Sequence, residues 1–139
     1  MDEARLRSVL LAGLAAGVIL NVGGMAAALL IGLGDSFTRA GASPQLGGAL
    51  LHTGLRFGIG LAVAYLYAIA GRRLGEGLSA VGKLVLPVWL IGYLPPVALL
   101  HEIGFLSRNQ AVLSAAWGLV EASAAISMAV LVYNRLSAK

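Results

Sequence analysis

The stretch from Leu46 to Ala70, LGGALLHTGLRFGIGLAVAYLYAIA, is apolar and long enough to cross a bilayer, yet it contains His52 and Arg56 one helical turn apart. A membrane-spanning helix needs about 20 predominantly apolar residues. A charge at the bilayer centre costs about 2.5–3.5 kcal/mol on insertion scales, so it persists only where a helix bundle or a watery cavity accepts it. The stretch therefore predicts a transmembrane helix that presents Arg56 to other helices.

Three further apolar runs can supply those helices. Together with the first stretch they predict spans at residues 8–33, 46–70, 84–100 and 110–133. The composition agrees, because 59% of the 139 residues are hydrophobic and 12% are charged, against about 45–50% and about 25% in soluble domains. The first run is also longer than the ~7–15-residue apolar core of a signal peptide. We expect one all-α domain over residues 1–139, a four-helix transmembrane bundle with up-down topology.

Local signals predict where the first two helices end and begin. The polar run from Gly34 to Ser43 is expected to be a connection. Ser43 and Pro44 suit an N-cap followed by proline at the first helical position of the second span. Gly71, which two arginines follow, is expected to end that span because glycine commonly stops helices.

The third span is expected to bend. Pro87 is tolerable in its first turn, whereas the pair Pro95 and Pro96 removes backbone donors and predicts a kink or early end near Tyr93. A short connection follows, and the sequence from Ser107 to Gln110 fits a capping box at the start of the fourth span.

Lysine and arginine counts predict the orientation in the membrane. The two tails and the middle loop contain seven of them: Arg5, Arg7, Arg72, Arg73, Lys83, Arg135 and Lys139. The opposite loops contain Arg39 and Arg108. Positive loops stay in the cytoplasm, so we expect both termini to be cytoplasmic and the protein to lie in the inner (plasma) membrane. The same helix-end placement, without interleaved aromatic residues, makes nucleic acid an improbable partner despite the net charge of +4.

Small residues predict where helices approach one another. Gly13, Gly17, Asn21, Gly24 and Ala28 fall on one face of the first helix. Small residues let another backbone come close, and an asparagine can hydrogen-bond across the contact. We expect the same packing role for glycines of the second and fourth helices, namely Gly54, Gly58 and Gly118.

Four polar residues are predicted to meet inside the bundle. Asn21, Arg56 and Glu121 lie near the middle of their spans, and His52 lies about one turn nearer the non-cytoplasmic side. Arg56 and Glu121 can neutralise one another, and the remaining guanidinium donors can reach Asn21 or backbone carbonyls. Such a centre either fixes helix register or serves as a proton or anion site in which Glu121 and His52 titrate.

Cofactor chemistry has one candidate ligand. The chain contains no cysteine, which excludes Cys-ligated metal sites. A zincin motif that begins at His101-Glu102 would need a second histidine at position 105, where the chain has Phe105. His52 within its span could be an axial ligand of a tetrapyrrole, either a pigment or a haem. Trp89, Tyr93 and Trp117 are interpreted as packing or interface residues. The main hypothesis is that the protein binds no cofactor, and the tetrapyrrole is kept as an alternative.

Short motifs in three of the four predicted spans resemble a group of small bacterial four-span membrane proteins of unknown function. They are VWLIGYLPP at Val88 to Pro96, WGLVE at Trp117 to Glu121, and Asn21-Val22-Gly23. In that group an acidic residue commonly follows the Asn-Val-x element, whereas this chain has Gly24. The resemblance implies the four-span fold and no particular activity, and it leaves Glu121 as the only acid within the predicted spans.

The leading hypothesis for function is a non-enzymatic accessory or scaffolding subunit that packs in the bilayer with copies of itself or with a larger complex. Small loops and the lack of a catalytic motif favour it. The alternative is a small oligomeric transporter or channel in which Glu121, Arg56 and His52 line a polar path. Tetrapyrrole binding through His52 is third. An enzyme is least favoured, because neither paired acids nor a nucleophile with its base is visible.

Overall fold

The computed structural model describes residues 3–39, 41, 46–75 and 77–138, and within these ranges the chain forms helices and turns without strands. The helices are α1 (Glu3–Leu30), α2 (Leu33–Arg39), α3 (Leu46–Leu74), α4 (Leu78–Gly92), α5 (Leu94–Glu102) and α6 (Arg108–Ser137). Four stretches are long and apolar enough to span a membrane: α1, α3, α4 continued by α5, and α6. The chain is an all-α bundle of a multi-pass membrane protein.

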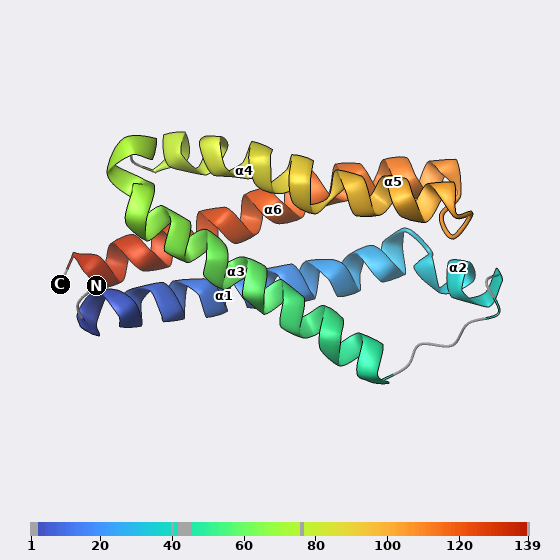
Figure 1. The fold of residues 1–139 in the computed structure, drawn as a ribbon, viewed down its shortest axis with the longest axis horizontal. Coiled ribbons are helices and arrows are strands. Elements are labelled where there is room, and N and C mark those ends of the chain that lie inside the picture. The colour runs from blue at the N-terminus through green and yellow to red at the C-terminus, as the bar shows by residue number, and fades with distance from the viewer. Residues whose placement is uncertain (1–2, 40, 42–45, 76, 139) are drawn as a thin grey trace.

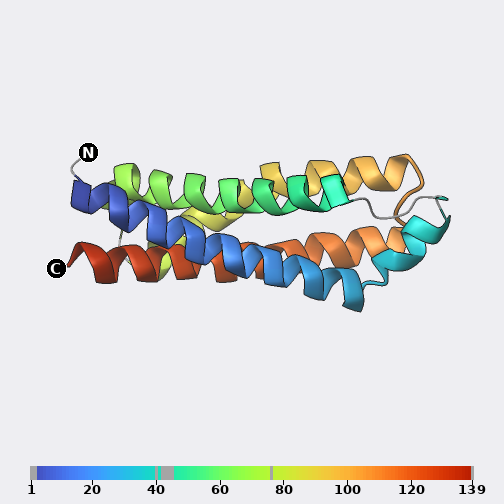
Figure 2. The same ribbon diagram turned by 90° about the horizontal axis from the view of Figure 1, so that it is seen from below.

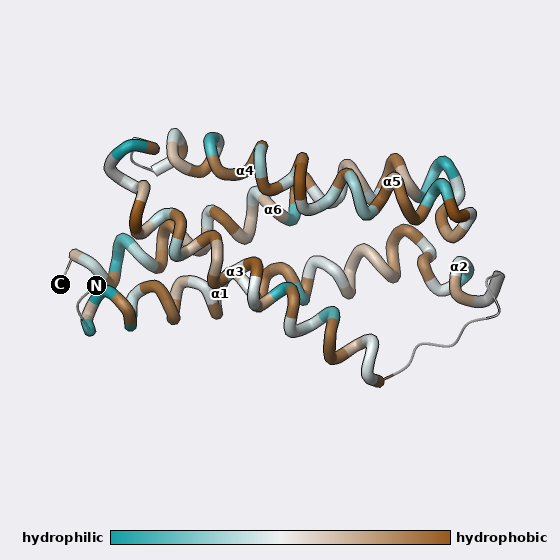
Figure 3. Tube along the Cα trace, viewed as in Figure 1, coloured by the Kyte–Doolittle hydropathy of each residue, from teal (hydrophilic) through white to brown (hydrophobic). Residues whose placement is uncertain are grey.

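The four long elements run alternately up and down (Figures 1 and 2). Both termini and the turn between α3 and α4 lie at one end of the bundle, which we call the terminal end. The turn into α2 and the loop between α5 and α6 lie at the other, which we call the α2 end. This arrangement confirms the predicted up-down topology. Hydrophobic colours cover most of the four spans, and hydrophilic colours gather near helix ends and at one part of α3 (Figure 3).

Most helices are longer than predicted. The helices α1, α3 and α6 contain 28, 29 and 30 residues, which at about 1.5 Å per residue exceeds the ~30 Å hydrocarbon thickness. The helices begin at Glu3, Leu78 and Arg108, before the approximate span starts predicted at residues 8, 84 and 110, because helical hydrogen bonding continues through the residues that flank each apolar run. Gly71 does not end α3, which continues to Leu74; Gly75 follows with a φ of 92° that favours glycine.

A short helix replaces part of the predicted first connection. The helix α2 starts after Gly32, whose φ is 69°, and it is held to α6 through Ser36. The Ser36 hydroxyl donates to Oε1 of Gln110 at 3.2 Å, and Nε2 of Gln110 donates to the Gly32 carbonyl at 3.0 Å. The predicted N-cap at Ser43 and Pro44 lies outside the described residues.

The predicted capping box at the start of α6 is confirmed. The backbone N–H of Gln110 donates to the Ser107 hydroxyl at 3.3 Å, and the backbone N–H of Ser107 donates to Oε1 of Gln110 at 3.1 Å. One side chain therefore both starts α6 and holds the α2 end together.

The third span breaks at Tyr93, as the proline pair predicts. There α4 ends at Gly92, and α5 begins at Leu94 with Pro95 and Pro96 in its first turn, where the missing N–H groups leave no unmade helical bond. Pro87 lies inside α4 and not in its first turn, because α4 begins earlier than predicted.

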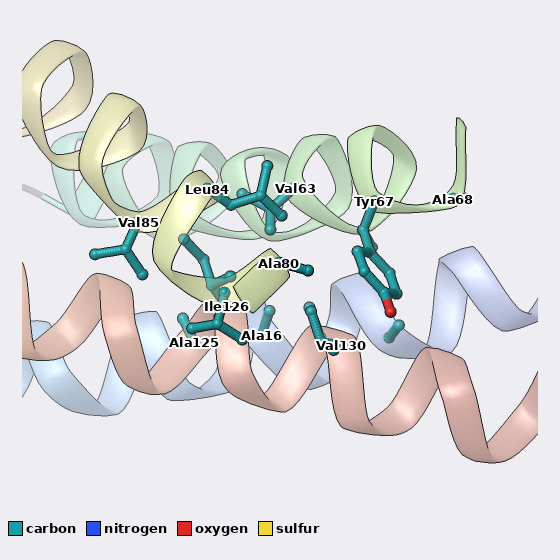
Figure 4. Close-up of a cluster of buried hydrophobic side chains, with 14 of the residues drawn as sticks. Ala16, Val63, Tyr67, Ala68, Ala80, Leu84, Val85, Ala125, Ile126 and Val130 are labelled. Atoms are coloured by element: carbon teal, nitrogen blue, oxygen red, sulfur yellow. The ribbon is translucent and has the colours of Figure 1, made fainter. Parts of the chain in front are cut away.

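The apolar core occupies the terminal half of the bundle (Figure 4). Its small side chains, such as Ala16, Ala80 and Ala125, allow the helix axes to come close. The closest approach joins α1 and α3: a Cβ built on Gly60 would lie 2.5 Å from the Gly13 carbonyl oxygen and 2.7 Å from the Gly17 nitrogen. From this crossing toward the α2 end, α3 diverges from α1 in both views (Figures 1 and 2).

Candidate functional site

A buried ion pair lies at the centre of the bundle. Nη1 of Arg56, on α3, donates to Oε1 of Glu121, on α6, and to the carbonyl oxygen of Leu20, on α1. Glu121 is 4% exposed. The equal depth of Arg56 and Glu121 in their spans predicts this pairing, and the structure brings the two side chains together with a backbone carbonyl of a third helix.

Tyr93 completes the coordination of the carboxylate. Its hydroxyl donates to Oε2 of Glu121 at 3.0 Å, so each carboxylate oxygen accepts a hydrogen bond. Sequence reasoning assigned Tyr93 to packing and missed this contact. The available signal was a hydroxyl-bearing ring at the helix break, where the change of direction turns the side chain toward α6.

Three glycines make room for the polar centre. A Cβ on Gly23 would lie 2.6 Å from Oε1 of Glu121, and one on Gly24 would lie 2.6 Å from Cζ of Arg56. A Cβ on Gly118 would overlap the ring of Tyr93. Gly24 and Gly118 were expected to pack closely against a neighbour, but Gly23 was not singled out.

His52 contacts the ion pair from the outer side of α3. Nε of Arg56 donates to Nε2 of His52 at 2.8 Å, although the imidazole itself is exposed. Because a guanidinium N–H can only donate, Nε2 is the unprotonated nitrogen and Nδ1 carries the proton of the neutral ring. This hydrogen bond occupies the lone pair that an axial ligand to a tetrapyrrole would use.

Asn21 does not join the cluster. Its Nδ2 donates to the Gly17 carbonyl of its own helix at 2.8 Å. The prediction that Asn21 bonds across a helix contact or to Arg56 is therefore wrong for the described residues. A span-centred asparagine satisfies part of its hydrogen-bonding capacity most easily on the preceding turn, where an acceptor is always in reach.

Two predicted packing glycines meet no neighbour among the described residues. No heavy atom lies within 4 Å of a Cβ built on Gly54 or Gly58, whereas Gly13 and Gly17 pack against α3 as predicted. The glycine of α3 that approaches α1 is Gly60. All residues of 46–55 are exposed, so none of the described helices packs over the first part of α3.

The described residues contain no group of three or more His, Asp or Glu side chains placed to hold a metal ion. The chemistry of the centre is that of a hydrogen-bonded ion pair, in which each carboxylate oxygen of Glu121 accepts one hydrogen bond, from Arg56 or from Tyr93. A cavity of about 180 Å³ reaches this pair from the α2 end, between α1, α5 and α6.

Comparisons with protein-family models, with curated protein sequences and with solved structures found no match to the chain. The function is therefore inferred from the arrangement of the chain's own residues.

Proposed function

We propose that the protein is a non-enzymatic integral membrane subunit that assembles side by side with other subunits in the bilayer, and that the exposed part of α3 is its contact surface. The first partner we consider is a second copy of the chain. A different subunit of a larger complex is the other form of the same hypothesis.

The observation that carries this proposal is the exposure of residues 46–55 on every side. Gly54 and Gly58 lie one turn apart with open space above them, which is the small-xxx-small pattern that lets two membrane helices approach closely. Together they leave room for a facing helix.

His52 adds a polar reason for a partner. Its Nδ1 has no hydrogen-bond partner among the described residues. A polar ring inside a span is costly when it faces lipid alone, and an acceptor on a neighbouring helix would remove part of that cost. The contact surface would then combine close backbone approach with one hydrogen bond.

The polar centre fits a structural role in this proposal. Arg56 joins α3 to α1 and α6, and Tyr93 joins the third span to the same carboxylate. Such bonds fix the register of helices that are otherwise mostly apolar. The central charges then position the exposed part of α3.

The charge bias of the loops supports an orientation with both termini in the cytoplasm. We propose the inner (plasma) membrane as the location on the same ground. The described structure is compatible with this orientation because the termini and the turn between α3 and α4 share one end of the bundle (Figure 1).

The transport alternative receives support from the cavity that reaches Arg56 and Glu121. A transport path would also have to continue to the terminal end. There the tightly packed apolar side chains of Ala16, Val63 and Ile126 fill the space between the helices (Figure 4). Transport therefore requires a rearrangement of this core, and we place it second.

Disulfide cross-linking in membranes tests the proposal cleanly because the chain has no cysteine. Leu51→Cys places a thiol on the proposed surface, and Ile91→Cys is the matched control on α4. Both positions are exposed, Leu51 to 65% and Ile91 to 76%. We expect an oxidised dimer from Leu51→Cys and little from Ile91→Cys.

A second variant separates the two forms of the hypothesis. Gly54→Leu should break the assembly, whereas Gly82→Leu, at another glycine with open space above it, should not. Loss of a homodimer supports self-assembly, and loss of a co-purifying subunit supports a larger complex. The proposal is overturned if the unsubstituted protein purifies from its native membrane as a monomer without any co-purifying protein.

A further inference from the structure

The cavity at the α2 end has the features of a small-molecule site. It is a half-open cavity lined by side chains from α1, α5 and α6, and Arg56 reaches it from α3. Its floor is the ion pair of Arg56 and Glu121 together with Tyr93, while most of the wall is apolar, with Ala27 on α1 and Val97 on α5. The cavity is therefore mostly apolar, and its hydrogen-bonding side chains are those of the floor together with Ser114 on α6.

Its size limits what can enter. The volume is about 180 Å³, and an apolar protein cavity of about 150 Å³ is large enough to hold benzene. One substituted six-membered ring fits within this volume. Three aromatic side chains line this space, Tyr93, Phe105 and Trp117. The Trp117 indole is held in place by its hydrogen bond to the Gly23 carbonyl at 3.0 Å.

The charge of the floor limits the ligand further. Arg56 and Glu121 neutralise one another, so an anion or a cation would add an uncompensated charge in a region of low dielectric. The floor therefore suits a neutral molecule.

The floor also offers hydrogen-bond acceptors. A carboxylate has about four lone-pair positions, and the bonds from Arg56 and Tyr93 occupy one on each oxygen of Glu121. A ligand hydroxyl can donate to one of the remaining positions. The Tyr93 hydroxyl oxygen can accept as well, since its proton is directed to Glu121.

We propose that this cavity binds a small neutral ring compound that carries a hydroxyl group, with the ring beside Trp117 and the hydroxyl donating to Glu121. A phenolic head group is the simplest member of this class. The proposal does not depend on lateral assembly, because every residue that it uses belongs to one chain.

The fluorescence of Trp117 can report binding of 4-bromophenol, a ring of the proposed size with a quenching bromine. The chain has two tryptophans, so Trp89→Phe leaves Trp117 as the only tryptophan. In detergent micelles we expect quenching that saturates with 4-bromophenol concentration. The matched ligand is 4-bromoanisole, in which a methyl group replaces the hydroxyl proton. Its affinity should be at least about tenfold weaker, since a hydrogen bond to a charged group is lost.

A pair of neighbouring substitutions checks the location. Ala27→Phe should fill the cavity and abolish saturable quenching, whereas Ala28→Phe, on the exposed side of α1, should retain it. If Ala27→Phe fails to fold, the comparison of the two ligands in the Trp89→Phe protein still decides. Equal affinity for both ligands, or quenching that rises linearly without saturation, overturns the proposal and assigns the cavity to ordinary lipid chains.

Discussion

The Tyr93 hydroxyl lies 3.0 Å from Oε2 of Glu121, and this hydrogen bond ties the break between α4 and α5 to the middle of α6. The tie matters because α5 has no buried residue among its nine. A second polar tie lies nearby, where Nε1 of Trp89 donates to the Ala115 carbonyl at 2.8 Å. The third span is thus attached to α6 through hydrogen bonds as well as through packing.

We predict that Tyr93→Phe lowers the free energy of unfolding by about 0.6–1.5 kcal/mol, the range of single hydrogen bonds in membrane and soluble proteins. The measurement is unfolding in mixed micelles as the fraction of sodium dodecyl sulfate rises. In a Glu121→Leu background the same substitution should cost close to nothing, because the acceptor is gone. Equal losses in both backgrounds would mean that the hydroxyl acts elsewhere.

The ion pair gives a second prediction. Glu121→Gln leaves the Arg56 guanidinium in low dielectric without a compensating charge, so it should destabilise the bundle by several kcal/mol at most. In soluble proteins, removing one partner of a buried ion pair costs about 3–5 kcal/mol. The double variant Arg56→Leu with Glu121→Leu should recover much of this loss. Removing both charges should therefore be less damaging than removing one.

The quantity that decides is the coupling energy of the full double-mutant cycle, since single substitutions also change packing. Leu substitutions at both positions complete the cycle in the same micelle assay. A coupling near zero would contradict the structural pairing. A stable double variant that no longer assembles would show that the pair acts on the contact surface and not only on helix register.

The spans and their alternation could be predicted from the sequence because apolar runs of this length have one stable arrangement in a bilayer. The helix α2 could not, because its seven residues form a helix through contacts made far along the chain, between Ser36 and Gln110. Likewise α3 is apolar on most sides, so periodicity does not choose which face meets α1. Sequence reasoning selected Gly54 and Gly58, while the contact uses Gly60.

The polar centre was predictable only in part. Depth along the spans identifies Arg56 and Glu121, because two opposite charges in a bilayer must meet. Depth does not specify how each helix is rotated about its axis. A prediction from depth alone therefore misses Tyr93 as a donor to Glu121 and wrongly places Asn21 in the cluster. Which short-range acceptor a polar side chain takes is decided by local geometry at the helix break and on the preceding turn.

The crossing of α1 and α3 gives a third prediction. Gly60→Ala would place a methyl group 2.5 Å from the Gly13 carbonyl oxygen, and backbone atoms cannot yield as a flexible side chain can. We expect a loss of about 1–3 kcal/mol, as for overpacking in general. The control is Gly82→Ala, where nothing lies within 4 Å and replacing glycine in a helix should be neutral or stabilising by up to about 1 kcal/mol. Similar results for the two variants would contradict the close crossing.

The last prediction concerns orientation. A reporter fused after Lys139 and one inserted near Glu76 should both lie in the cytoplasm, while one inserted near Arg39 should lie outside it. The reason is that basic loops resist translocation and the middle loop and tails contain most of the lysine and arginine. Replacing Arg72, Arg73 and Lys83 together by glutamine tests whether these charges set the orientation. The triple variant should weaken the charge bias, so that the reporter near Glu76 is found on both sides of the membrane. An external reporter at Lys139 in the unmodified sequence would contradict the orientation, and opposite locations for Lys139 and Glu76 would contradict the number of spans.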